Sequence, residues 1–148
     1  MTFKFQQIGF TYIGVLLMIA LSGVGLATVG VVWHTENKRE KEKELLFIGK
    51  QFSKAIESYM QSSVGATQYP SSLNDLIIDR RLLIKKRHLR KIFRDPMTDS
   101  FEWGLQKEKG RIVGVYSKSS GKPLTKVFET EFESFKGAKT YSEWTFMP

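Results

Sequence analysis

The chain has 148 residues, a formal net charge of +8 and no cysteine. This length is typical of one domain, and the missing cysteines exclude a disulfide framework, a thiolate metal site and a cysteine nucleophile. The positive charge favours contact with anionic surfaces such as lipid head groups, nucleic acid or acidic proteins, but it indicates nothing about the fold.

An apolar stretch occupies the first quarter of the chain. No Asp, Glu, Lys or Arg stands between Lys4 and Glu36, and the run from Ile8 to Trp33 is 26 residues long. A helix needs about 20 apolar residues to cross a hydrocarbon core. The run is too long for the core of a cleaved secretory signal, which spans roughly 7–15 residues. It therefore predicts a transmembrane helix over 10–34, the alternative being a buried helix of a soluble protein.

The helix is expected to continue past this stretch. Charges of both signs interleave from Glu36 to Glu44, which fits a solvated helix but does not require one. Gly65 is a candidate left-handed cap farther on. An amphipathic stripe lies between them at steps of mostly three and four, formed by Leu45, Ile48, Phe52, Ile56, Tyr59 and Met60. The pattern predicts one helix from about Phe10 to Ser63, whose amphipathic half covers 35–63.

Residues 64–148 are expected to form an α+β head. Ser71 or Ser72 is a candidate cap for a short second helix, and the DPMTDS segment after it predicts a turn. Without disulfides, this head depends on an apolar core that its aromatic residues would supply. The predicted fold class is α+β, with a long N-terminal helix packed on a small antiparallel sheet.

The sheet is expected late in the chain. The segments 101–106 and 111–117 read as strands on either side of a KEKG hairpin connection. A third strand is expected over 142–146. Residues 127–135 fit a helix or a strand, and the sequence leaves this element open.

Three segments in order carry a resemblance to a known family. Residues 9–13, GFTYI, resemble the G-F-T-L-I start of prepilins, with a short leader before them. Residues 68–77, QYPSSLNDLI, resemble the segment after the long helix in major pseudopilins of type II secretion, and 90–103 resemble their DP-W-G turn and following strand. Over about its first 105 residues the chain resembles the type IV pilin and pseudopilin family.

The resemblance implies a processed filament subunit with a pilin-like fold. Residues 1–9 would be a prepilin leader, and prepilin peptidase would cut between Gly9 and Phe10 and N-methylate Phe10. The protein would cross the inner membrane once, with its head in the periplasm. Its partners would be prepilin peptidase, other pseudopilins in a helical filament, the inner-membrane assembly platform and the lipid bilayer.

Small residues in the apolar half permit close helix packing. They are Ala20, Gly23, Ala27 and Gly30. The alternative is that Gly and Ala are simply common in membrane helices. Two positions depart from the family: Gly14 stands where a Glu is usual, and Val31 stands where many members have Pro. The missing carboxylate points to a minor or specialised subunit, such as one at the filament tip.

The flanking charges disagree with the orientation that the resemblance implies. Lys4 precedes the apolar stretch, whereas four basic residues follow it: Lys38, Arg39, Lys41 and Lys43. Counted alone, they favour a cytoplasmic head. We follow the resemblance, because the leader motif is more specific than the charge count.

A basic patch follows the predicted second helix. It consists of Arg80, Arg81, Lys85, Lys86, Arg87, Arg90, Lys91 and Arg94. Such a patch is able to contact phosphates, lipid head groups or DNA. The favoured interpretation is a solvated connector that meets acidic faces of neighbouring subunits, because Phe93 alone offers a stacking platform for bases.

No catalytic or metal-binding motif stands out. The two histidines, His34 and His88, are far apart, and the loop that resembles a calcium-binding segment in the family carries lysines instead of aspartates. We therefore expect a structural protein without cofactor or metal. The runner-up function is a non-assembling single-pass membrane anchor with a basic head that binds a ligand or DNA.

Overall fold

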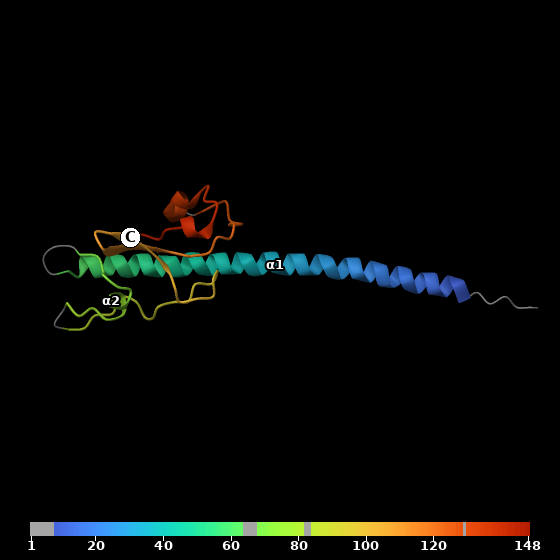
Figure 1. Cartoon of the computed structure of the whole chain (residues 1–148), viewed down its shortest axis with the longest axis horizontal. Coiled ribbons are helices and arrows are strands. Elements are labelled where there is room, and N and C mark those ends of the chain that lie inside the picture. The colour runs from blue at the N-terminus through green and yellow to red at the C-terminus, as the bar shows by residue number, and fades with distance from the viewer. Residues whose placement is uncertain (1–7, 64–67, 82–83, 129) are drawn as a thin grey trace, which may run out of the picture. The chain divides into compact units, whose positions relative to one another are not determined.

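The computed structural model describes residues 8–63, 68–81, 84–128 and 130–148, except for the side chains of 8–11 and 23–32. The chain divides into two units, Met1–Lys38 and Arg39–Pro148. The helix α1, Ile8–Gln61, contributes to both units (Figure 1).

The helix α1 confirms the predicted long helix, with each end two residues earlier than expected. Over the described residues, none of the helices combines the length and the apolarity that crossing a membrane requires. The predicted span 10–34 includes Phe10, Thr11 and 23–32, whose side chains lie outside that description.

Within the second unit, the residues after α1 pack on the C-terminal half of this helix and bury the predicted stripe. Leu45, Phe52 and Ile56 are fully buried, and Met60 is half-buried at the margin. Gly49 lies in the middle of this face, where an added Cβ would come within 2.3 Å of the Phe146 ring. The absent side chain thus lets the C-terminal segment lie directly on the helix.

The sheet is one antiparallel hairpin, β1 (Gly104–Glu108) and β2 (Arg111–Tyr116). β1 continues to Glu108, two residues closer to the turn than predicted, and β2 begins at Arg111 as predicted, so that only Lys109 and Gly110 connect them. Both residues have a positive φ, 49° and 79°, as a tight primed turn requires. The side chains of Ile112 and Val115 are fully buried in the core. The residues that the structure describes therefore confirm an α+β unit with a small antiparallel sheet on a long helix.

The helix α2, Asn74–Ile77, is shorter than one expects from its apolar spacing. The predicted serine contact is present in part: the Ser72 hydroxyl accepts from the Asn74 backbone amide at 3.0 Å, although Leu73 is the N-cap residue. The carboxylate of Asp75 accepts hydrogen bonds from the backbone amides of Ser71 and Ser72 at 3.0 and 2.9 Å, and from the Ser71 hydroxyl at 2.7 Å. The Asp75 carboxylate therefore holds the turn that enters α2, in addition to the Ser72 hydroxyl.

The predicted DPMTDS turn is present and closes on a buried aspartate. Asp95 donates its backbone amide to the Ser100 carbonyl at 2.7 Å. Its side chain, which is not exposed, accepts from the Met97 amide and from the hydroxyls of Thr98 and Ser117. The last of these bonds ties the turn to the segment after β2.

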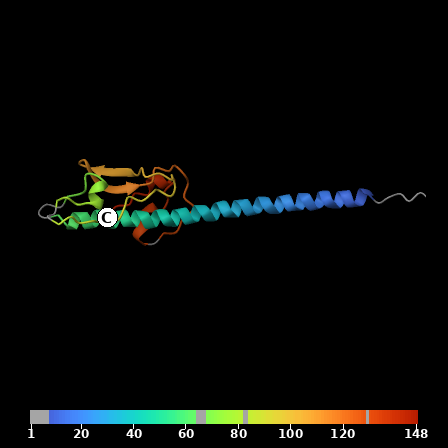
Figure 2. The same cartoon turned by 90° about the horizontal axis from the view of Figure 1, so that it is seen from below.

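The C-terminal segment differs from the prediction. Residues 127–135, which the sequence left open, contain the 3-10 helix η1 (Thr130–Phe135), with Phe132 and Phe135 buried. The expected third strand over 142–146 is wrong: η2, Tyr141–Glu143, occupies its start, and only Phe146 bridges to Val115. Figures 1 and 2 show this red segment against α1 and the hairpin. Aromatic packing around the fully buried Trp144 takes the place of strand pairing.

Candidate functional site

The segment between α2 and the Asp95 turn carries the predicted basic patch at the C-terminal end of α1. Backbone hydrogen bonds hold it in place: the amides of His88 and Leu89 both donate to the Leu76 carbonyl, at 2.9 and 2.8 Å. The Asp79 amide donates to the Lys86 carbonyl at 2.9 Å. Leu89 is buried, so the segment is fixed on the head as well as charged.

A bidentate ion pair stands at the centre of this segment. The Arg81 guanidinium donates to both carboxylate oxygens of Asp79, at 3.0 and 2.7 Å. Asp79 is fully buried, and these bonds hold the pKa of its carboxyl well below the usual range. The same guanidinium lies 3.4 Å from the centre of the Tyr59 ring and donates to the Tyr59 carbonyl at 2.8 Å. Arg81 thereby joins the segment to the last turns of α1.

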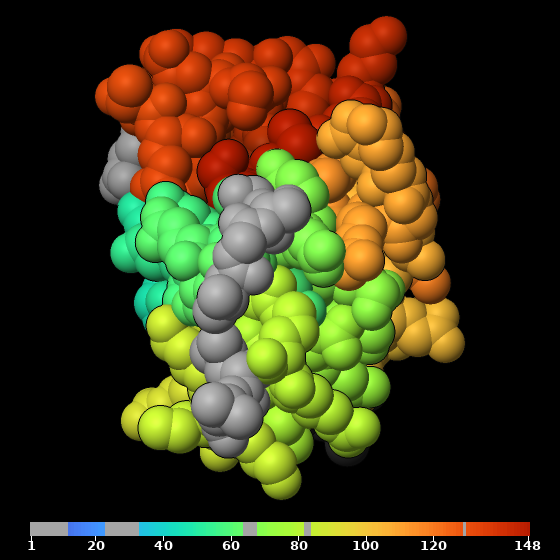
Figure 3. All heavy atoms as spheres, turned by 90° about the vertical axis from the view of Figure 1, so that its left-hand side faces the viewer, coloured from blue at the N-terminus to red at the C-terminus, as the bar shows by residue number. Residues whose placement is uncertain are grey.

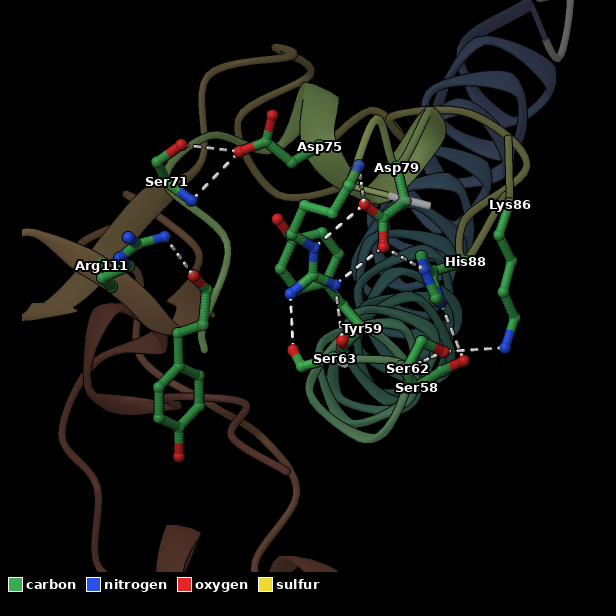
Figure 4. A network of polar contacts seen from close by, with 12 residues as sticks. Ser58, Tyr59, Ser62, Ser63, Ser71, Asp75, Asp79, Lys86, His88 and Arg111 are labelled. Carbon is green, nitrogen blue, oxygen red and sulfur yellow. Dashed lines mark hydrogen bonds and ion pairs between the residues drawn. The ribbon is translucent and has the colours of Figure 1, made fainter. Parts of the chain in front are cut away.

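His88 is the second link between the segment and the helix (Figure 4). Its Nδ1 lies 2.8 Å from the Ser58 hydroxyl, and its Nε2 lies 3.3 Å from the Asp79 carboxylate. The imidazole is buried, and burial lowers the pKa of His88 against the opposing effect of Asp79. The neutral ring is the form that this packing favours.

Ser58, His88 and Asp79 have the composition of a nucleophilic triad, but their arrangement indicates a structural link. The carboxylate that would support the imidazole already pairs with Arg81. The serine lies inside α1, where its carbonyl accepts the bond from the Ser62 amide at 3.1 Å. A triad needs a base whose carboxylate is available to it and donors for an oxyanion. The network instead connects two chain segments.

Two of the eight predicted patch residues are therefore not available cations. Arg81 is paired with Asp79, and Arg94 is paired with Asp99 at 3.1 Å. Both acids lie nearby in the sequence, two and five residues away, but only the folded chain shows that they pair with these arginines. The other six form what we call the basic face: Arg80, Lys85, Lys86, Arg87, Arg90 and Lys91.

The side chains of the basic face are exposed. Among the residues that the structure describes, no carboxylate lies within ion-pair distance of any of the six. Lys86 donates to the Ser62 hydroxyl at 2.8 Å, which places a positive charge beside the C-terminal end of α1. Figure 3 looks onto this end of the second unit, where the yellow-green segment covers much of the surface.

The predicted processing and packing residues lie on α1. Gly9 and Phe10 are in its first turns, and their side chains lie outside the described residues, as do those of Gly23, Ala27 and Gly30. Ala20 is exposed in the single chain. An added Cβ at Gly14 would meet no atom within 4 Å. Val31 also lies outside the described side chains.

Sequence reasoning missed a second polar centre, at Glu42. This residue was treated as one of the interleaved solvated charges, but its side chain is 1% exposed. Its carboxylate accepts from the backbone amides of Leu124 and Thr125, at 2.5 and 3.1 Å, and from the Thr125 and Tyr141 hydroxyls, at 2.7 and 2.6 Å. A signal was present, since Glu42 stands three residues before Leu45 in the buried stripe.

The geometry provides no cluster of metal ligands in the part of the chain that the structure describes. No protein family, no curated protein and no solved structure matches this chain.

Proposed function

We propose that the chain is a pseudopilin-like structural subunit of a type II secretion filament, or of a related type IV pilus-like filament. Prepilin peptidase cuts before Phe10 and methylates it, and the helix then anchors a periplasmic head in the inner membrane until assembly. One observation carries the proposal: α1 runs from Ile8 to Gln61 without interruption and holds a folded head on its C-terminal half.

The N-terminal half of α1 supports this proposal because it exposes apolar side chains. From Tyr12 to Leu21 the described apolar residues are exposed, among them Met18 at 72% and Leu21 at 71%. Such a surface needs cover by lipid or by other apolar helices. A subunit that moves from a bilayer into a helix-packed filament has both forms of cover.

The second unit supports the proposal because its helix and head are joined as one body. The core packs Leu45, Phe52 and Ile56 against β2 and the C-terminal aromatic residues. Buried polar contacts from Glu42 and Asp79 fasten segments on either side of this core to α1 or its end. A head attached in this way follows its helix during assembly without having to rearrange.

The first test is the intact mass and the N-terminal sequence of the protein purified from its native membrane. The proposal expects a chain that begins at Phe10 and carries the mass of one added methyl group. A Gly9→Leu variant is the matched control, because it changes the residue before the cut without touching the described head. It is expected to keep Met1. A wild-type chain that retains Met1 overturns the proposed processing.

The alternative is a non-assembling membrane anchor with a basic, ligand-binding head. The basic face favours it, because the six cations have no carboxylate partner among the described residues. Stacking of nucleic-acid bases gains no support, since the Phe93 ring packs edge-on against Phe52 at 6.3 Å and Lys91 lies over it. An intact Met1 together with no crosslinks between copies in the native membrane would favour this anchor.

A further inference from the structure

Two exposed isoleucines stand in the same segment as the basic face. Ile84 is 85% exposed and Ile78 is 41% exposed, and Lys85 directly follows the former in the chain. Exposed isoleucines next to cations that have no carboxylate partner among the described residues fit a partner that offers both negative charge and an apolar layer. We propose that the basic face, together with Ile78 and Ile84, docks onto an anionic phospholipid bilayer. This contact is additional to the apolar half of α1 and independent of the proposed processing.

The cations are presented in a fixed arrangement. Arg87 donates through Nη2 to the Arg90 carbonyl at 2.7 Å, and the backbone between them is held on α2. A shallow hollow of about 460 Å³ lies over this stretch, lined by Arg87, His88, Leu89 and Arg90. Arg87 and Arg90 both line this hollow, and arginine suits a phosphate group, whose oxygens accept several N–H bonds at once.

A second copy of the chain is a poor partner for the basic face. The chain carries 23 Lys and Arg against 15 Asp and Glu, so a second copy offers the basic face a net positive partner. Most of its carboxylates already bind groups of the same chain. They include Glu42, Glu57, Asp75, Asp79, Asp95, Asp99, Glu102, Glu131, Glu133 and Glu143. The anionic partner of the basic face is therefore a molecule other than a second copy of this chain.

A bilayer fits the face better than nucleic acid does. Basic residues bind lipid phosphates at the head-group level, while an isoleucine between them enters the boundary of the hydrocarbon region. A DNA duplex offers phosphates but no apolar layer for Ile84. The Phe93 ring, which could stack on bases, packs against Phe52 instead. Anionic lipid supplies both requirements, whereas neutral lipid supplies the apolar layer without net charge.

The experiment uses the absence of cysteine from the full chain. Ile84→Cys is labelled with an environment-sensitive fluorophore in the full chain, held in neutral nanodiscs, and vesicles with or without phosphatidylglycerol are added. Val127→Cys is the matched control, because Val127 is equally exposed at 85% and lies outside the basic face. We expect a blue shift and protection from aqueous acrylamide at position 84 with anionic vesicles, and no change at position 127.

Removing two positive charges from the basic face measures how much these charges contribute to vesicle binding. Arg87→Gln with Arg90→Gln leaves the Asp79–Arg81 pair intact, and circular dichroism checks the fold. Each cation near an anionic surface changes partitioning about fivefold, so the double variant is expected to weaken vesicle binding about 25-fold. No response at position 84, equal responses at both positions, or no effect of the double variant overturns the proposal.

Two further measurements, competition by inorganic phosphate and binding of duplex DNA, identify the ligand of the basic face. Inorganic phosphate at millimolar concentration is expected to compete weakly with vesicles. If phosphate alone abolishes vesicle binding, the hollow is a free-phosphate site and the bilayer assignment fails. If duplex DNA binds the full chain and anionic vesicles do not, the face is a nucleic-acid surface and the proposal is overturned. N-terminal sequencing of the same preparation reports separately on the proposed function.

Discussion

The hydroxyl of Tyr141 donates a hydrogen bond to the carboxylate of Glu42 over 2.6 Å, although 99 positions of sequence separate them. Both side chains are buried, the tyrosine completely. The same carboxylate accepts three bonds from Leu124 and Thr125. One charged side chain of α1 thus fixes two separate parts of the C-terminal segment, which otherwise has little regular structure.

Replacement of this carboxylate is expected to destabilise the head strongly. In Glu42→Gln the amide group keeps one acceptor oxygen and turns its NH₂ toward donors, which leaves buried donors unpaired. We expect a loss of about 2–4 kcal/mol in the free energy of unfolding, measured by urea denaturation. Tyr141→Phe removes a single bond. Its loss in the free energy of unfolding is therefore expected to be about 1 kcal/mol smaller than that of Glu42→Gln. Equal stability of Glu42→Gln and wild type would contradict a carboxylate clamp.

The ionisation of Tyr141 offers a pH test of the same contact. Burial first, and then the bond to Glu42, raise the pKa of Tyr141 well above its usual range. Because its folded pKa is raised, the stability that Tyr141 contributes is present below the unfolded value of about 10 and is lost as the pH rises above it. Urea denaturation between pH 8 and 11 is expected to show this loss, and Tyr141→Phe is expected to reduce it.

Acid is expected to weaken the link at the end of α1 in two stages. Burial lowers the pKa of His88, which also faces Asp79, Lys86 and Arg81, so its contribution is lost as the pH falls below about 6.5. The bonds from Arg81 lower the pKa of Asp79, so its larger contribution is lost as the pH falls below about 4. The urea midpoint between pH 8 and 3 should fall in both ranges.

Single variants separate the two stages. His88→Gln is expected to remove the first decline of the urea midpoint, and Asp79→Asn is expected to remove the second. Asp79→Asn also lowers the free energy of unfolding at pH 7 by about 3 kcal/mol, because it leaves Arg81 without its partner. Identical acid profiles for Asp79→Asn and wild type would show that the pair does not govern acid stability.

Gly49 is expected to tolerate no side chain. An Ala at this position would bring its Cβ within 2.3 Å of the Phe146 ring, which must then shift. We expect Gly49→Ala to lower the free energy of unfolding by about 1–3 kcal/mol despite the better helix propensity of alanine. The double variant with Phe146→Leu is expected to recover part of the loss. A stabilised Gly49→Ala would refute the close approach.

Gly14 allows a test of assembly under the proposed function. Its position has room in the single chain, since an added Cβ meets no atom within 4 Å. The resemblance implies that a glutamate there pairs with the amino terminus of a neighbouring subunit. Gly14→Glu is therefore expected to increase recovery in sheared filaments about threefold, a gain typical of one modest ion pair, with cleavage before Phe10 unchanged. Gly14→Gln is the uncharged control, and equal recovery of the two variants contradicts the pairing.

Local sequence patterns predicted the elements of the second unit well where a short-range rule applies. The helix stripe from Leu45 to Tyr59 follows from helical periodicity, because residues three and four apart share one face. The turn at Asp95 and the hairpin at Lys109 and Gly110 follow from turn-forming residues. The C-terminal segment was less predictable, since Trp144 and Phe146 alternate with Thr145 as in a strand, yet Trp144 packs among aromatic rings and only Phe146 bridges to β2.

The sequence by itself determined that a long helix carries an α+β head and that the segment after α2 is strongly basic. Only the tertiary structure decided which charges are available. Glu42 is buried by residues more than 80 positions away, Arg81 is neutralised by Asp79, and six other cations are left without a described partner. The reason is physical: periodicity is set by neighbours along the chain, whereas the cost of a charge depends on burial and on which groups the fold places against it, whether they lie 2 or 99 positions away.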